Sequence, residues 1–196
     1  MRSRLNISVT TLSVIMSLTF INSALPQKAT EQSAFGLKPQ LVADFIFSVI
    51  EADRTLYARQ VVQRMQNSRT IIASETWMHR NALPLPSQML TMAGKRVEAN
   101  GLGLTYRLAS LSPIYEKNRP TTDFERRGLE AIRQHPEKPY TGIVMKDQKP
   151  YFQAIYSDRA VTKACVNCHN AHVLSPKRDY QLHDVMGGVI ISFPLK

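Results

Sequence analysis

The most distinctive chemistry in this 196-residue chain lies in the pentapeptide Cys165-Val166-Asn167-Cys168-His169, which contains both of its cysteines. The pattern C-x-x-C-H is the attachment signature of a c-type haem. Two thiols three positions apart can each add to one haem vinyl group, and the next residue then places an imidazole beneath the iron. The motif therefore predicts one covalently bound haem c, attached through Cys165 and Cys168, with His169 as the proximal iron ligand.

Three other kinds of site use similar residues. A thioredoxin-like dithiol needs its cysteines at the start of a helix directly after a strand, usually within a βαβ unit, whereas residues 158–164 separate this pair from the nearest expected strand. A disulfide between Cys165 and Cys168 would close a very small loop and stabilise little. A zinc site formed with His172 and His183 would have an uncommon spacing. Haem attachment is favoured because an independent export signal accompanies the motif.

That export signal lies at the N-terminus. Arg2 and Arg4 precede an uncharged, largely apolar run over residues 5–21, and small residues follow up to Ala24. A basic start, an apolar middle and a small-residue end predict a secretory signal peptide over residues 1–24. The alternative is an uncleaved membrane anchor, although several Ser, Thr and Asn side chains dilute the run. The protein is expected to be periplasmic or otherwise extracytoplasmic, and tethered to a membrane only if the segment stays uncleaved.

Composition narrows the class of protein and of partner. The chain has 43% hydrophobic and 20% charged residues, which fits a folded domain and argues against disorder. Its 25 Lys and Arg exceed its 15 Asp and Glu, giving a formal net charge of +10. The basic residues are scattered and form no stripe with aromatic residues, so the charge indicates nucleic-acid binding only weakly, and we expect no nucleic-acid partner. A docking face for an acidic partner is equally compatible with the charge.

Hydrophobic patterning predicts a loose segment over residues 25–38 and one α+β domain over residues 39–196. A long helix is expected from Pro39 to about Arg69, because apolar residues recur every three to four positions; they are Leu41, Phe45, Val49, Ala52, Leu56, Val62 and Met65. A second helix is expected from an N-cap at Ser87 to Asn100-Gly101.

The remaining elements are expected to form an antiparallel sheet flanked by helices. A capping box over Thr122–Glu125 predicts a short helix to about Arg133, after a loop over residues 112–120. The expected strands are 104–109, 140–146, 151–157 and 187–193, and the middle two form a hairpin around residues 147–150.

Several spaced blocks together resemble a known family; they are Tyr106–Ser110, Asn118–Pro120, Asp123–Arg126, Tyr151-Phe152, the cysteine motif, and Asp179–Gln181 through Gly187-Gly188. The family is the extracytoplasmic c-haem domain with a PAS-like fold, catalogued as a domain of unknown function. It occurs as a single exported domain and as the sensor part of bacterial membrane histidine kinases. The resemblance covers about residues 53–196 and implies a PAS-like antiparallel sheet with a long N-terminal helix. The chain departs from the family where His183-Asp184 stands in place of a usual Gly-Asp.

The sixth iron ligand decides between functions. Some members of this family use a cysteine thiolate there, which this chain cannot do because both cysteines are assigned to the haem vinyl groups. We favour Met89, whose helix entry is fixed by two prolines, followed by His79 beside an aromatic and thioether cluster and His183 beside Asp184. Other candidates remain open, namely His135, His172, Met65, Met78, Met92, Met145 and Met186.

The haem propionates need cationic or hydrogen-bonding partners. Arg107 is preferred because a strand residue can face the haem, ahead of the alternatives Arg126, Arg127, Lys177 and Arg178.

The resemblance implies redox or small-gas sensing, or electron transfer, rather than catalytic turnover. A small haem enzyme such as a peroxidase is the alternative, disfavoured because no distal acid–base residue stands out. No signalling domain follows Lys196, so sensing would require a separate signalling protein, and electron transfer a redox partner.

Overall fold

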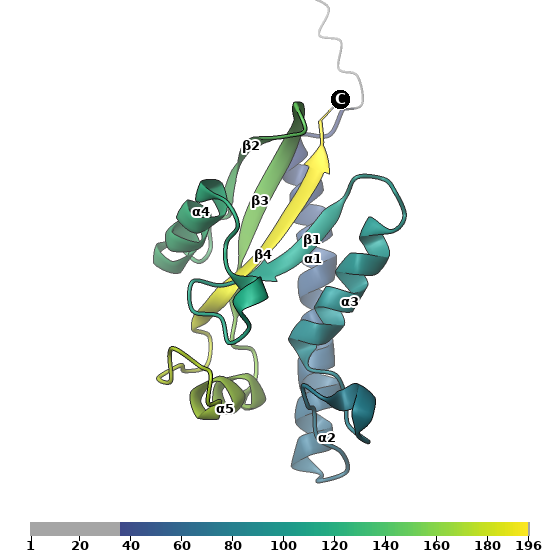
Figure 1. Ribbon diagram of the computed structural model, residues 1–196, viewed down its shortest axis with the longest axis vertical. Coiled ribbons are helices and arrows are strands. Elements are labelled where there is room, and N and C mark those ends of the chain that lie inside the picture. The colour runs from purple at the N-terminus through teal and green to yellow at the C-terminus, as the bar shows by residue number, and fades with distance from the viewer. Residues whose placement is uncertain (1–35, 196) are drawn as a thin grey trace, which may run out of the picture. The chain divides into compact units, whose positions relative to one another are not determined.

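A four-stranded antiparallel sheet forms the centre of the domain, with helices on both of its faces (Figure 1). The structure is a computed structural model and describes residues 36–195. Its strands are β1 (Thr105–Ala109), β2 (Tyr140–Lys146), β3 (Lys149–Arg159) and β4 (Val185–Pro194), in the spatial order β1-β4-β3-β2. Its α-helices are α1 (Pro39–Leu56), α2 (Arg64–Asn67), α3 (Pro86–Glu98), α4 (Asp123–Gln134) and α5 (Lys163–Ala171). The predicted α+β class is confirmed, and the arrangement is consistent with a PAS-like fold.

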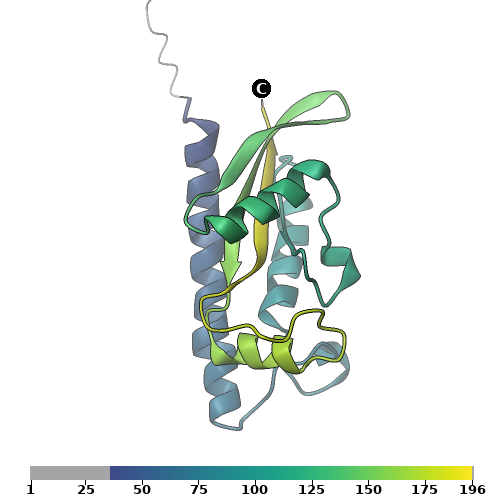
Figure 2. The same ribbon diagram turned by 90° about the vertical axis from the view of Figure 1, so that its left-hand side faces the viewer.

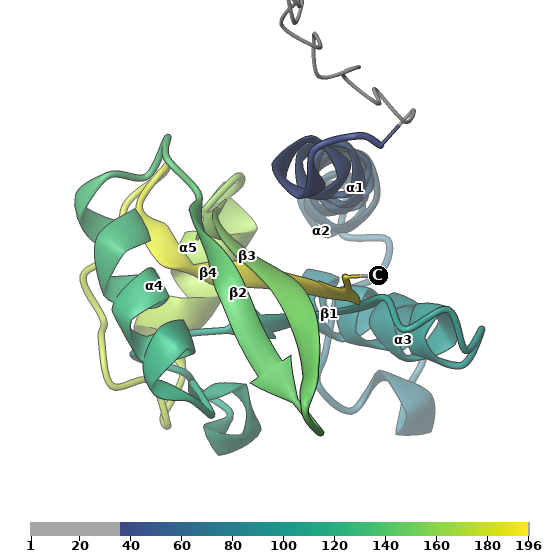
Figure 3. The ribbon, with the colours of Figure 1, turned by 90° about the horizontal axis from the view of Figure 1, so that it is seen from above.

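The sheet separates two apolar cores, because successive side chains of a strand point to opposite faces. Helices α1 and α3 pack on one face and α4 packs on the other (Figure 3). In β3, Ala154 and Tyr156 belong to the core under α1, whereas Ile155 belongs to the core under α4 together with Ile132. Since β3 is buried on both faces over this stretch, it holds the two layers together.

The long N-terminal helix has its predicted length but buries a different face from the one predicted. Helix α1, a π-helical segment (Tyr57–Gln63) and α2 follow one another without a break from Pro39 to Asn67. The buried positions are Ala43, Ile50, Ala58 and Val62. Phe45, Val49 and Leu56, which belong to the predicted stripe, are 54%, 63% and 57% exposed.

Two properties of this helix explain why its buried face differs from the predicted one. The helix carries two apolar stripes, and periodicity does not reveal which one faces the sheet. Ala43 and Ala58 are 0% and 1% exposed, so the buried stripe includes small residues that allow a close approach. The π-helical turns also rotate the following residues relative to an ideal α-helix. Val62, which was grouped with the exposed stripe, lies four residues after Ala58 and is buried with it.

Helix α3 begins at Pro86, one residue before Ser87, which was predicted to be its N-cap. Leu85, not Ser87, is the N-cap, and Pro86 occupies the first helical position. Proline suits this position because its missing N–H would have no partner inside the helix anyway. The Gln88 side chain accepts a hydrogen bond from the Leu85 N–H at 2.9 Å, which replaces the cap expected from serine.

Helix α4 begins with the predicted Thr122 cap. Its hydroxyl accepts a hydrogen bond from the Glu125 N–H at 3.2 Å. In a complete capping box, the Glu125 carboxylate would also accept a hydrogen bond from the Thr122 N–H. This second hydrogen bond is absent from the helix, because the carboxylate accepts instead from the Thr121 N–H at 2.6 Å and from Arg107 at 2.5 Å. Glu125 is therefore a buried link between α4 and β1.

The predicted hairpin is present, with a tighter turn and a longer second strand. Asp147 and Gln148 have φ values of 48° and 62°, and they alone connect β2 to β3. Two consecutive positive φ angles are typical of a two-residue type I′ hairpin turn. Strand β3 starts at Lys149 and continues to Arg159, beyond both ends of the predicted strand.

Some predictions concern residues outside the described range. The signal peptide over residues 1–24 and most of the 25–38 segment are in this class, and only residues 36–38 of that segment are described, as irregular chain before α1. Within residues 36–195, none of the helices combines the length and apolar character that crossing a membrane requires.

Candidate functional site

The cysteine motif lies on α5, at the end of the domain where β3 finishes (Figures 1 and 2). Thr162 caps the helix by accepting a hydrogen bond from the Cys165 N–H at 3.3 Å. The neighbouring Ala164 N–H donates to the Gln63 side chain at 3.0 Å, which ties α5 to the π-helical segment. The attachment helix is thus fixed both by its own cap and by the long helix.

Helix geometry gathers the three motif side chains. Residues three and four apart on a helix are surface neighbours, so Cys165, Cys168 and His169 lie on one side of α5. Both cysteines are free thiols. Val166 and Cys165 pack against a small apolar cluster that includes Tyr180. This arrangement presents two thiols and an imidazole together, as the haem prediction requires.

His169 is a suitable metal ligand in its present environment. Burial lowers its pKa most, and the nearby positive charge of Arg54 and the neighbouring His172 lower it further. The neutral imidazole, which is the form that binds metals, is therefore favoured at neutral pH. Its Nδ1 atom is buried without a hydrogen-bond partner. Within residues 36–195 no hydrogen bond to Nδ1 therefore holds the ring in an orientation that would exclude an iron atom.

The sequence-based argument against a reactive dithiol was the distance between the cysteines and the preceding strand, and the structure does not support that argument. Because β3 extends to Arg159 and α5 starts at Lys163, the cysteines do stand near the start of a helix soon after a strand, contrary to the expectation from sequence. The strands of the sheet are all antiparallel, so no βαβ unit surrounds the helix. Burial, Glu75 and Cys165 together raise the pKa of the Cys168 thiol. A thioredoxin-like dithiol usually lies within a βαβ unit, so the antiparallel sheet beside α5 opposes this alternative.

The zinc alternative is also not supported. Among residues 36–195, no group of three His, Cys, Asp or Glu side chains is placed to hold a metal ion. His172 is occupied, since its Nε2 lies 3.3 Å from a Glu75 carboxylate oxygen and its Nδ1 accepts from the Leu174 N–H at 3.2 Å. His183 is exposed in a left-handed backbone conformation with φ of 72°.

Two of the three favoured sixth-ligand candidates lie on a segment that touches α5. The backbone oxygen of Glu75 accepts from Gln88 at 2.8 Å, while its carboxylate contacts His172 at the end of α5. This segment carries His79, which is exposed, and leads to Met89, which is half-buried in the first turns of α3. His183 instead donates its backbone N–H to Ala160, just before α5. None of these contacts brings a candidate side chain next to His169, so the sixth ligand remains a prediction.

Arg107 is engaged away from the attachment helix. Its guanidinium forms an ion pair with Glu125 and contacts Thr121 at 3.4 Å. The Glu125 carboxylate is only 5% exposed, which makes Arg107 its main neutralising partner. These contacts give Arg107 a structural role and lend no support to its predicted contact with a haem propionate.

Sequence reasoning missed a charged pair whose arginine acts on His169. Arg54 and Asp158 form an ion pair at 2.9 Å, with both side chains 11% exposed. Burial raises the pKa of Asp158, and the opposing charge of Arg54 counteracts that effect. Arg54 lies four residues from Ile50 and from Ala58 on the buried face of the helix. A charge on that stripe was a signal, but it was overlooked because the other stripe was assigned to the core.

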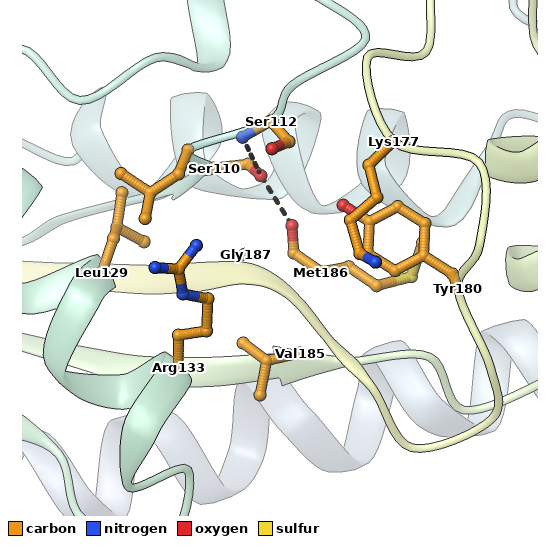
Figure 4. Close-up of a pocket in the computed structure, with 10 residues that line it drawn as sticks. Ser110, Ser112, Leu129, Arg133, Lys177, Tyr180, Val185, Met186 and Gly187 are labelled. Carbon is orange, nitrogen blue, oxygen red and sulfur yellow. Dashed lines mark hydrogen bonds between the residues drawn. The ribbon is translucent and has the colours of Figure 1, made fainter.

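Tyr180 was also missed as a neighbour of His169. The two rings meet edge to face, with centroids 5.7 Å apart. Behind Tyr180 lies a cavity of about 80 Å³, which Met186 and Arg133 also line (Figure 4). Organic ligands usually occupy several hundred cubic ångströms, so this cavity is too small for a porphyrin. A haem would therefore lie against another side of α5, where Cys168 is exposed.

Comparison with known proteins identifies the family. A model of the family described as Tll0287-like matches residues 42–194. The chain belongs to the Tll0287-like family. The crystal structure of the cyanobacterial haem protein Tll0287 matches over 82% of this chain and 98% of that chain, with 13% sequence identity and a TM-score of 0.46. No curated protein gives a significant match.

Proposed function

We propose that this member of the Tll0287-like family is an exported monohaem c-type cytochrome-like protein that acts in electron transfer or in redox or small-gas sensing. The main observation is the shared side of α5, where two free thiols accompany a neutral, partly buried imidazole with an unpartnered nitrogen. Membership of the family adds support, since Tll0287 is itself described as a haem protein.

The side chains of the chain would divide the work of holding the cofactor. Cys165 and Cys168 would form the thioether bonds, and His169 would bind the iron from the side supported by Tyr180. Arg59 is exposed and donates from Nε to the Val161 carbonyl at 3.4 Å, which places a cation beside the start of α5. It is better situated than Arg107 to meet a propionate. A bound haem would supply one-electron exchange and, with a vacant or weakly held sixth position, ligation of small gases.

Mass spectrometry of the denatured protein tests covalent attachment. After expression in cells that mature c-type cytochromes, the chain should carry the mass of one haem. Cys165→Ala or Cys168→Ala should weaken or abolish this addition. The mass of the bare polypeptide in the parent protein would refute haem c, because thioether bonds survive denaturant.

Spectroscopy separates the two possible roles. We infer that Met89 fills the sixth position, which would give a near-infrared charge-transfer band in the oxidised protein and a reduction potential above that of a bis-histidine site. Single substitutions of Met89, His79 and His183 by Ala should then change the spin state only for Met89. A high-spin ferrous spectrum with rapid CO binding in the parent protein would contradict this ligand and favour gas sensing.

A further inference from the structure

One half of the α4-side face of the sheet is not covered by α4. The helix packs over the part that contains Ala109, Ile155 and Ile190. The β2–β3 hairpin extends beyond α4 on this side (Figure 2). In the uncovered half, a hollow of about 570 Å³ lies over polar residues of the strands and is bordered by the start of α4. We call it the sheet groove and define it by Thr105, Arg107, Glu125, Lys146, Gln153 and Ser192.

The floor of the sheet groove contains an unpartnered polar group. Gln153 is 5% exposed, and its side-chain oxygen is buried without a hydrogen-bond partner. The adjacent Ser192 is 2% exposed. Burying an amide oxygen without a donor is unfavourable, and such groups in folded proteins usually have a protein, water or ligand partner. Gln153 therefore has an acceptor beneath the groove for which the residues of the described chain supply no donor.

The wall of the sheet groove contributes a cation that lacks a carboxylate. Lys146 donates to the Ser192 hydroxyl at 3.0 Å and lies 5.0 Å from the centre of the Tyr151 ring. It forms none of the ion pairs found within residues 36–195. Burial lowers its pKa, and the more distant Glu125 and Glu98 oppose that effect while Arg107 adds to it.

The sheet groove is also lined by the carboxylates of Glu98 and Asp123, besides Arg107 and Glu125. Glu98 is exposed to solvent, and Asp123 pairs with Arg126. Arg107 and Glu125 neutralise each other at 2.5 Å. Glu125 also accepts from the N–H and the hydroxyl of Thr121, at 2.6 Å and 2.9 Å, so its capacity to bind a further cation is small. The groups left for a ligand on the floor and wall of the groove are thus the Lys146 ammonium, which has no paired carboxylate, and the Gln153 side-chain oxygen, which has no donor within residues 36–195.

These two groups lie close enough to meet a single small molecule. Gln153 and Ser192 are direct cross-strand partners of β3 and β4, and both point to the α4 side. Side chains paired in this way have Cβ atoms about 5 Å apart. Because the Lys146 ammonium contacts Ser192, the cation and the unpartnered oxygen lie on either side of one serine. The volume of the groove is within the range usual for small organic ligands.

We propose that the sheet groove binds a small carboxylic acid that carries a hydroxyl or amino group on the adjacent carbon. Its carboxylate accepts from Lys146, and its hydroxyl or amino group donates to the Gln153 side-chain oxygen. The site is separate from the cysteine motif, since Arg159 lies six positions after Gln153 along β3, or about 20 Å of extended chain. The proposal therefore holds whether or not a haem is attached at α5.

Titration of the full exported chain with defined small molecules tests this proposal without any substitution. Lactate and alanine serve as probes, acetate lacks the donor group, and lactamide lacks the carboxylate. We expect saturable changes in the amide NMR signals of Lys146, Gln153 and Ser192 with lactate or alanine, and at least tenfold weaker binding of acetate and lactamide. Absence of saturable binding by both probes would overturn the proposal, and equal binding of acetate would overturn the role of Gln153.

Three variants locate the site. Lys146→Gln and Gln153→Met should each weaken binding of the better probe at least tenfold, by isothermal titration calorimetry. Lys149→Gln is the matched control, because it removes an exposed charge from the same hairpin outside the groove, and it should bind as the parent does. Circular dichroism verifies folding of each variant. Unchanged affinity in a folded Lys146→Gln protein would refute the assignment.

Discussion

At the scale of single residues, His169 is the group on which the proposed iron site depends most directly. In His169→Ala the two thioether bonds should still hold the porphyrin, while the iron loses its imidazole. We expect covalent haem to remain at reduced yield, with a changed spectrum and a shifted reduction potential. His172→Ala is the control, since that ring contacts Glu75 and lies at the end of α5. If His169→Ala matched the parent in both redox states, His169 would not be the ligand.

Arg107 provides a second test, of stability rather than spectrum. Arg107→Gln removes the cation beside the buried Glu125 carboxylate and should lower the free energy of unfolding by about 1–3 kcal/mol. Arg126→Gln breaks only exposed ion pairs with Asp123 and Glu130, so its cost should stay below about 0.5 kcal/mol. Urea unfolding measures both. A shifted haem potential in Arg107→Gln with full stability would instead restore the propionate role predicted from sequence.

The contrast between these residues shows what a sequence can reveal about a site. The cysteine motif was identifiable because its chemistry depends on local spacing, which folding does not alter. The neighbours of His169 were not identifiable, since Arg54 and Tyr180 come from two segments that are distant from each other in the sequence. The contact of Arg107 with Glu125 was not identifiable for the same reason. The position of Arg107 on a strand was predicted well, but its partner Glu125 comes from another element and determines its role.

At the scale of elements, the long helix offers a direct comparison of its two apolar stripes. Ile50→Ala removes a side chain that is 9% exposed, so it should lower the free energy of unfolding by about 2–4 kcal/mol. Val49→Ala is the neighbouring control, at 63% exposure, and should cost less than about 1 kcal/mol. Chemical denaturation of both variants provides the measurement. Equal losses of stability would mean that the Val49 stripe is also covered in solution.

Most element boundaries followed from local signals, whereas the orientation of the elements did not. The Thr122 cap, the alternation in β1 and the apolar run in β4 are local signals, and each predicted its element within a few residues. The face of α1 depends on the sheet, whose strands follow it in the chain by at least about fifty residues. The π-helical segment added a rotation for which the hydrophobic periodicity gave no warning.

At the scale of the whole molecule, the excess of basic residues leads to a prediction about electron exchange. The chain carries a formal charge of +10, and Arg59 and Lys163 are exposed next to the attachment helix. A positive surface attracts anionic reactants, and salt screens this attraction. Oxidation of the reduced haem protein by an anionic metal complex should slow about three- to tenfold between low and high ionic strength. Oxidation by a cationic complex should instead accelerate. Stopped-flow absorbance follows both reactions.

In Arg59→Gln the salt dependence of the rate should decrease, and Lys149→Gln, which alters the distant hairpin, should resemble the parent. Rates that do not depend on ionic strength would show that the net charge does not act at the haem, and would remove the reason for expecting an acidic redox partner.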